Sequence, residues 1–196
     1  MAGYDPATAL VVVDVQNDFA DPKGSLYVKG SEEVPSFINA AARAARRGGA
    51  LVVFTQDWHP PSTPHFARDG GAWPVHCVGG AWGAELHPDL ETLPDDPRIR
   101  KGAGGEDGYS GFTVADPGTG ERAGTGLERL LRERGVKRVV VVGIATDYCV
   151  KATAIDATEL GFETAVLAEG IRAVDLRSGD GQRALEEMRG AGVRIE

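Results

Sequence analysis

The chain has little cysteine, no excess of positive charge and no long apolar run. Two cysteines in 196 residues argue against a disulfide-rich secreted scaffold, which needs several pairs. Lysine and arginine number 21 against 29 aspartates and glutamates. The resulting net charge of -8 argues against nucleic acid or an anionic membrane as a partner, because both bind basic surfaces. The longest apolar runs have only strand length, so we expect no membrane span.

The N-terminal segment, residues 1–9, lacks the basic and apolar regions of a signal peptide and carries Asp5 and Pro6 instead. We therefore expect a cytoplasmic protein whose cysteines are reduced. The length suits one domain with a sizeable core, and we expect residues 1–196 to form it.

Apolar runs of strand length alternate with helically spaced segments along the chain. Strands are expected at 10–15, 50–55, 98–101, 139–143, 163–168 and 193–195, and helices at 34–47, 126–134, 151–160 and 181–189. This order predicts an α/β fold, a three-layer αβα sandwich around a mostly parallel sheet of about six strands. The segment at about 56–97 is too long for a simple connection and holds all four histidines. We expect it to be an ordered loop insertion that belongs to a site.

Cys149 follows a run of four valines, residues 139–142, where a strand gives way to a helix. Such a run predicts a strand buried on both faces, and open α/β folds place their sites at the carboxyl ends of these strands. Thr146 or Asp147 is expected to cap the helix, whose dipole would favour a thiolate. Position alone leaves a buried structural thiol as an equal alternative.

Two charged residues end other predicted strands. Asp14 follows the apolar residues 10–13, where a carboxylate is costly unless it is paired or part of a site; capping of the next segment is the alternative. Lys101 ends a short strand and would lower the pKa of a neighbouring thiol, although a surface lysine is the ordinary alternative. Because parallel strands end at one edge, we expect Asp14, Lys101 and Cys149 to face one crevice.

Asp57 and His59 leave the end of the second predicted strand. In extended backbone these two side chains point the same way, so both can reach one ion. His65 and His76 follow in the same loop, and a carboxylate with two or three imidazoles suits Zn²⁺, Fe²⁺ or Mn²⁺. Solvated histidines are common, so the spacing alone leaves a metal site as a hypothesis. Cys77 is either a softer ligand or a packed thiol.

Five segments carry a resemblance that covers nearly the whole chain. They are residues 13–19 (VDVQNDF), 56–60 (QDWHP), 73–77 (WPVHC), 101–112 with KG and YSGF at its ends, and 143–150 (GIATDYCV). On these motifs the sequence resembles the nicotinamidase branch of the isochorismatase-like cysteine hydrolase superfamily. The first and last segments match patterns found across the superfamily, and the segments with tryptophan and histidine match the nicotinamidase branch.

The resemblance implies hydrolysis of nicotinamide, and of pyrazinamide, through a cysteine thioester, with one divalent metal ion orienting the ring. Zn²⁺ is preferred over Fe²⁺ or Mn²⁺. The implied site comprises the catalytic triad Asp14, Lys101 and Cys149, the oxyanion-hole amides of Ala145 and Cys149, the ring pocket of Phe19, Trp73, Tyr109 and Ile144, and the metal ligands Asp57, His59 and His76. A cis peptide bond between Ile144 and Ala145 is also implied.

The sequence departs from the family pattern at two places, and both bear on the site residues that the resemblance implies. Thr63 stands where many relatives have a histidine, which makes His65 the candidate for a fourth metal ligand. Residues 102–108 form a glycine-rich segment one residue longer than in some relatives, which bears on the placement of Tyr109.

Other functions remain open from the sequence. The nearest is a related cysteine amidase acting on a carbamoyl or ureido substrate, which would share the triad but need no metal for a pyridine nitrogen. A second alternative is an isochorismate-cleaving enzyme, whose chemistry does not require the cysteine. A third is a metal-dependent hydrolase in which Cys149 has only a structural role. The last is a non-catalytic binding protein, which would give the triad no function. The expected partner is a small molecule, with no nucleic acid or membrane, and homo-oligomerisation is left open.

Overall fold

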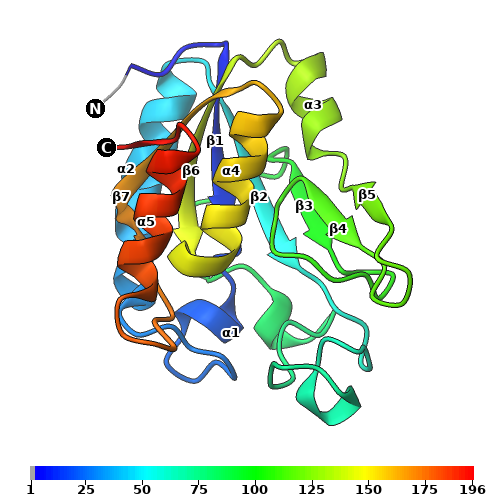
Figure 1. Cartoon of the computed structure of the whole chain (residues 1–196). Helices are drawn as coiled ribbons and strands as arrows, with labels where there is room; N and C mark the ends of the chain where they lie inside the picture. Colours follow the sequence, from blue (N-terminus) through cyan, green and yellow to red (C-terminus); the bar gives the residue numbers. More distant parts are fainter. Residues whose placement is uncertain (1–2) are drawn as a thin grey trace.

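The computed structural model describes residues 3–196, so the first two residues of the predicted domain lie outside the described part. A six-stranded sheet in the order β3-β2-β1-β6-β7-β8 forms its centre (Figure 1), and every neighbouring pair is parallel. The strands are β1 (Thr8–Val13), β2 (Leu51–Asp57), β3 (Arg98–Lys101), β6 (Arg138–Ile144), β7 (Glu163–Arg172) and β8 (Arg194–Ile195). The predicted parallel α/β sheet is confirmed.

Helices cover both faces of this sheet and complete three layers (Figure 1). On one face α2 (Val34–Arg47) packs against residues such as Leu10 and Val142. On the other face α3 (Leu127–Glu133), α4 (Lys151–Glu159) and α5 (Asp180–Gly190) pack against residues such as Val11 and Val141. Burial on both faces explains why the central strands are almost continuous valine. Within residues 3–196, no helix has the combined length and apolar character that crossing a membrane requires.

The chain leaves β1 earlier than the apolar run suggests. Asp14 has a left-handed backbone, with φ of 49°, so the strand ends at Val13 and not at Val15. A four-residue helix, α1 (Asn17–Ala20), follows and is too short to show a helical period in the sequence. The side chains of the residues after this turn reach different partners, which are described with the site below.

The segment after β6 also differs from the prediction. Residues Thr146–Val150 form a π-helical turn before α4 begins, and no side chain caps either element. The predicted cap by Thr146 or Asp147 is therefore wrong. The Asp147 carboxylate instead accepts the backbone N–H groups of Val174 and Asp175, at 3.0 and 2.9 Å. Asp147 thus joins the turn that carries Cys149 to the loop that follows β7.

The remaining elements are short. The segment between β2 and β3 contains two 3₁₀ turns, Ala67–Asp69 and Trp82–Ala84, and a third, Ser31–Glu33, precedes α2. A hairpin of three-residue strands, β4 (Thr113–Ala115) and β5 (Arg122–Gly124), follows β3. The sequence did not indicate this hairpin, because its strands are brief and β5 is exposed.

Gly143 allows the ends of β1 and β6 to approach closely. It pairs with Val13, has φ of 121°, and would place a Cβ only 2.1 Å from the Val13 carbonyl oxygen. Any side chain here would therefore push the two strands apart. This contact sets Asp14 beside the turn that carries Cys149.

We expect Gly143→Ala to lower the free energy of unfolding by about 2–5 kcal/mol, because the methyl group meets β1 and the backbone stays in a region unfavourable to L-residues. Gly120→Ala is the matched control. Gly120 has φ of 73°, but no atom lies within 4 Å of the position that a Cβ would take, so only the backbone cost of about 1–2 kcal/mol applies. Urea denaturation followed by circular dichroism measures both, and equal losses would contradict the tight contact.

Candidate active site

The carboxyl ends of four strands meet at one edge of the sheet, and each supplies a charged or reactive side chain. Asp14 follows β1, Asp57 ends β2, Lys101 ends β3, and Cys149 lies on the turn after β6. All four are buried. The structure therefore brings together the three residues expected to face one crevice and adds Asp57 to them.

The Lys101 ammonium lies at the centre of this group. Its Nζ is 2.7 Å from Asp14 Oδ2 and 2.6 Å from Asp57 Oδ1. It also donates hydrogen bonds to the Tyr109 carbonyl at 3.2 Å and to Cys149 Sγ at 3.5 Å. Burial by itself would lower the pKa of Lys101, but the two carboxylates and the thiol raise it well above its ordinary value. The lysine is therefore a fixed cation.

The two oxygens of the Asp14 carboxylate have different surroundings. The Thr55 hydroxyl donates to Oδ1 at 2.6 Å. Oδ2 is buried beside Lys101 and accepts no hydrogen bond of good geometry within residues 3–196. Burial raises the pKa of Asp14 above its usual range, and Lys101 only partly offsets this. A carboxylate with a raised pKa next to a thiol is suited to act as a general base.

The surroundings of Cys149 act on its thiol in opposite directions. Its Sγ lies within 4.8 Å of carboxylate oxygens of Asp14 and Asp57. Burial raises the pKa of Cys149 well above its ordinary value; Lys101 opposes this rise, and the two carboxylates add to it. Burial therefore opposes the thiolate that the helix dipole would favour. The thiol becomes a nucleophile only when a neighbouring base takes its proton.

Asp57 and three histidines form a second cluster beside the first. His59 Nε2 and His76 Nε2 each lie 3.9 Å from Asp57 Oδ2. Ring nitrogens of His59, His65 and His76 lie within 4.8 Å of one another. Both ring nitrogens of His59 are buried without a hydrogen-bond partner in the described chain, and His76 Nδ1 lies 2.7 Å from the Pro74 carbonyl. Unpartnered imidazole nitrogens around a carboxylate fit a divalent cation.

The protonation states of this cluster suit the same purpose. Burial lowers the pKa of His59 to about 4 and also lowers that of His76. Burial would raise the pKa of Asp57, but Lys101, His59 and His76 hold it below its usual range. At neutral pH the imidazoles are therefore neutral and the carboxylate is ionised, as cation binding requires.

Cys77 lies apart from this cluster. Its side chain is fully buried, and its Sγ faces the Gly83 carbonyl at 3.8 Å. Of the two interpretations left open, the packed thiol is the one that the structure supports.

Two buried polar residues after β1 fix the loops that carry the histidine cluster. Gln16 pairs with the Asp57 backbone in both directions, accepting from its N–H at 2.8 Å and donating to its carbonyl at 2.7 Å. Asp18 accepts the N–H groups of Cys77 at 2.7 Å and Ser25 at 3.1 Å. Sequence reasoning did not identify these positioning roles, because the contacts are with backbone atoms far along the chain.

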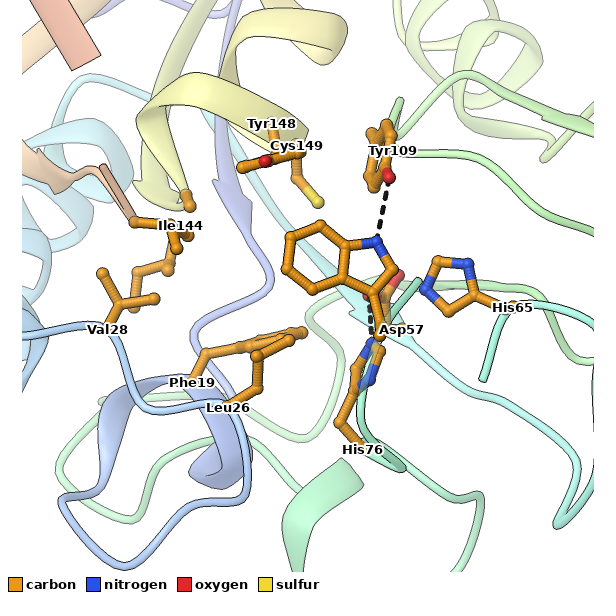
Figure 2. A pocket seen from close by; sticks show the side chains of 13 residues that line it. Phe19, Leu26, Val28, Asp57, His65, His76, Tyr109, Ile144, Tyr148 and Cys149 are labelled. Carbon is orange, nitrogen blue, oxygen red and sulfur yellow. Dashed lines mark hydrogen bonds and ion pairs between the residues drawn. The ribbon is translucent and has the colours of Figure 1, made fainter. Parts of the chain in front are cut away.

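A pocket with about 390 Å³ of empty space, part of it open to solvent, lies between the two clusters. Figure 2 shows Val28 and Ile144 on one side of it, Asp57, His65 and His76 on the other, and the Cys149 thiol facing the space between. The four residues predicted to form a ring pocket, Phe19, Trp73, Tyr109 and Ile144, all line it. Four more lining residues were not predicted, and of these only Tyr148 belongs to one of the five motif segments: Leu26, Val28, Tyr148 and Val174.

Aromatic side chains from three segments surround the mouth of this pocket. Trp73 Nε1 donates to the Tyr109 hydroxyl at 3.0 Å, and both rings pack edge-on against Tyr148, with centroid distances of 5.0 and 5.2 Å. The longer glycine-rich segment does not displace Tyr109 from the pocket. On the opposite side, the peptide bond between Ile144 and Ala145 is cis, as the resemblance implied.

Comparisons with known proteins match the chain to one family and to several of its members. A family model for the isochorismatase domain matches residues 8–195. The chain is 43% identical to a nicotinamidase/pyrazinamidase from Mycobacterium tuberculosis, over 95% of this chain and 97% of that protein. It resembles the structure of Pyrococcus horikoshii pyrazinamidase in complex with zinc, with a TM-score of 0.86, 40% identity and coverage of 97% and 99%. It also resembles PnC1 from L. infantum in complex with nicotinate, with a TM-score of 0.89, 38% identity and coverage of 100% and 95%.

Replacing Lys101 with methionine would leave two carboxylates buried side by side without a cation. We expect Lys101→Met to lower the free energy of unfolding by about 3–5 kcal/mol at neutral pH. Lys151→Met is the control, since the Lys151–Glu187 pair is partly exposed, with side chains 28% and 56% accessible, and should cost less than about 1 kcal/mol. Guanidinium denaturation of both variants tests this, and comparable losses would contradict the central role of Lys101.

Proposed function

Because the chain belongs to the isochorismatase family, we propose that it hydrolyses nicotinamide to nicotinate and ammonia. One observation carries this proposal: a thiol–carboxylate–lysine group and a histidine–carboxylate group flank the same small pocket. The first group has the chemistry to open a carboxamide, and the second has the chemistry to hold a cation against a ring nitrogen. Nicotinamide presents both features on one planar molecule, and so does pyrazinamide, which we propose as a second substrate.

The first half of the reaction forms a thioester. Cys149 Sγ attacks the carboxamide carbon while Asp14 Oδ2 takes the thiol proton. The tetrahedral intermediate then collapses, the carbon–nitrogen bond breaks, and Asp14 gives the proton to the departing nitrogen, which leaves as ammonia. The raised pKa of Asp14 supports this sequence, because the group must both accept and return a proton.

The second half regenerates the enzyme. Asp14 takes a proton from water, the resulting hydroxide attacks the thioester carbon, and the carbon–sulfur bond breaks. Asp14 then protonates the released Cys149 thiolate, and the acid product ionises to nicotinate. Atoms balance over the cycle: one nicotinamide and one water give nicotinate, ammonia and one proton.

Two further features stabilise the charges that develop. Lys101 stays protonated throughout and lies within hydrogen-bonding distance of Cys149 Sγ at 3.5 Å. We assign the oxyanion hole to the amides of Ala145 and Cys149, since both residues line the pocket. Each such donor typically contributes about 3 kcal/mol to the transition state.

The protein binds a divalent cation, and we propose that the ion is Zn²⁺. Asp57, His59 and His76 would hold it, with His65 as the fourth ligand. When bound, the ion supplies a Lewis-acidic contact that orients the pyridine nitrogen. Phe19 and Trp73 supply aromatic surface for the ring. We further propose that residues 1–196 form one domain in which the loop at about 56–97 presents the cation ligands.

The principal alternative is a cysteine amidase that acts on a carbamoyl or ureido compound. Such an enzyme would use the same triad, but its substrate has no ring nitrogen for a cation to hold. The three imidazoles beside Asp57 would then have no function in the pocket. The histidine cluster therefore favours a pyridine carboxamide.

Cys149→Ala should abolish ammonia release from nicotinamide, because no other group in the pocket can form the thioester. Nicotinamide binding, measured by calorimetry, should remain within about an order of magnitude, since the cation and aromatic contacts persist. Cys77→Ala removes the other buried thiol and serves as the control, with turnover retained. Normal turnover in Cys149→Ala would refute the nucleophile and revive a metal-dependent hydrolase.

Removing the metal should act mainly on substrate affinity. We expect chelator treatment to weaken nicotinamide binding at least about tenfold, because ring orientation is lost. The Cys149 thiol should still react with iodoacetamide. Elemental analysis establishes that the metal has been removed. Full affinity in metal-free protein would contradict the orienting role and favour the carbamoyl or ureido alternative.

A further inference from the structure

Residues 102–112, which we call the strap, connect β3 to β4 and pass along the rim of the pocket. The strap carries Asp107, whose Oδ1 lies 2.8 Å from His65 Nδ1. The same oxygen accepts the N–H of Gly108 at 2.8 Å, which orients the carboxylate. Asp107 lies between the KG and YSGF motifs of residues 101–112 and belongs to neither.

The strap does not depend on the His65 contact for its position. The Asp107 N–H donates to the Ala115 carbonyl at 2.8 Å, and the Ala115 N–H donates to the Asp107 carbonyl at 2.6 Å. These reciprocal bonds attach the strap to β4. The carboxylate is therefore presented to His65 from a backbone that is already fixed, so the strap does not need this hydrogen bond to hold its place.

His65 is placed so that its other ring nitrogen serves the histidine cluster. Its side chain is buried, its ring stacks on His59 with centroids 4.7 Å apart, and its centroid lies 5.3 Å from that of His76. Figure 2 shows His65 on the same side of the pocket as Asp57 and His76. When Nδ1 donates its proton to a carboxylate, the neutral imidazole presents a lone pair at Nε2.

We propose that Asp107 is a positioning residue for the cation: it fixes the tautomer and orientation in which His65 Nε2 becomes the fourth ligand. This inference rests on the cation site of the proposed function and adds a residue outside it. A carboxylate behind a histidine ligand also makes the imidazole a stronger donor.

The direct test is the Zn²⁺ affinity of the full chain, measured by competition with a chromophoric chelator. Asp107→Ala should weaken Zn²⁺ binding about 10- to 100-fold, the usual effect of losing a residue that supports a ligand. Asp107→Asn should lose less Zn²⁺ affinity than Asp107→Ala, because the asparagine amide oxygen still accepts a hydrogen bond from His65 Nδ1. Glu106→Ala is the matched control: it removes the same charge from the neighbouring strap position, where the carboxylate accepts from the Gly104 N–H. Its affinity should stay within about twofold of wild type.

A double-mutant cycle separates action through His65 from a general effect on the pocket. In a His65→Ala background, adding Asp107→Ala should cause no further loss of Zn²⁺ affinity. Additive losses, or unchanged affinity in Asp107→Ala alone, would overturn the inference and leave the proposed function intact. A wild-type chain that binds no Zn²⁺ would contradict the cation site and the inference together. Circular dichroism of each variant verifies that the fold is retained.

Discussion

One buried ammonium group holds the two halves of this site together. Charged residues lie at the carboxyl ends of β1, β2 and β3, and without Lys101 the buried carboxylates of Asp14 and Asp57 would repel each other. Asp57 gives one oxygen to the lysine and turns the other toward His59 and His76. The charge of Lys101 therefore compensates a carboxylate in the reactive group and a carboxylate in the cation group, so a change in one group alters the electrostatics of the other.

The same balance explains why the buried cysteine needs a neighbouring base. Burial disfavours charge on both Cys149 and Asp14, so the thiol keeps its proton and the neighbouring carboxylate has an increased affinity for one. When the proton moves from Cys149 to Asp14, a thiolate replaces a carboxylate as the anion beside the Lys101 ammonium, so the net charge of the site does not change.

The sequence was informative where structure follows from local pattern. Runs of valine predicted the buried parallel strands, and the two-residue spacing of Asp57 and His59 placed both side chains on one side of the chain. It was uninformative where the partner is distant. Asp147 has the local pattern of a helix cap, yet its carboxylate binds backbone N–H groups after β7. Asp107 lies in a glycine-rich segment without periodicity, and only the folded chain shows that it faces His65.

The three polar residues after Asp14 recognise main-chain atoms. Gln16 binds the backbone of Asp57 and the Ala84 carbonyl, Asn17 donates to the Trp82 carbonyl, and Asp18 accepts from Cys77 and Ser25. Peptide groups are the same whatever side chain they bear, so these contacts place a loop without constraining its composition. Substitutions in the walls of the pocket can consequently change the choice of substrate while the contacts that place the loops remain.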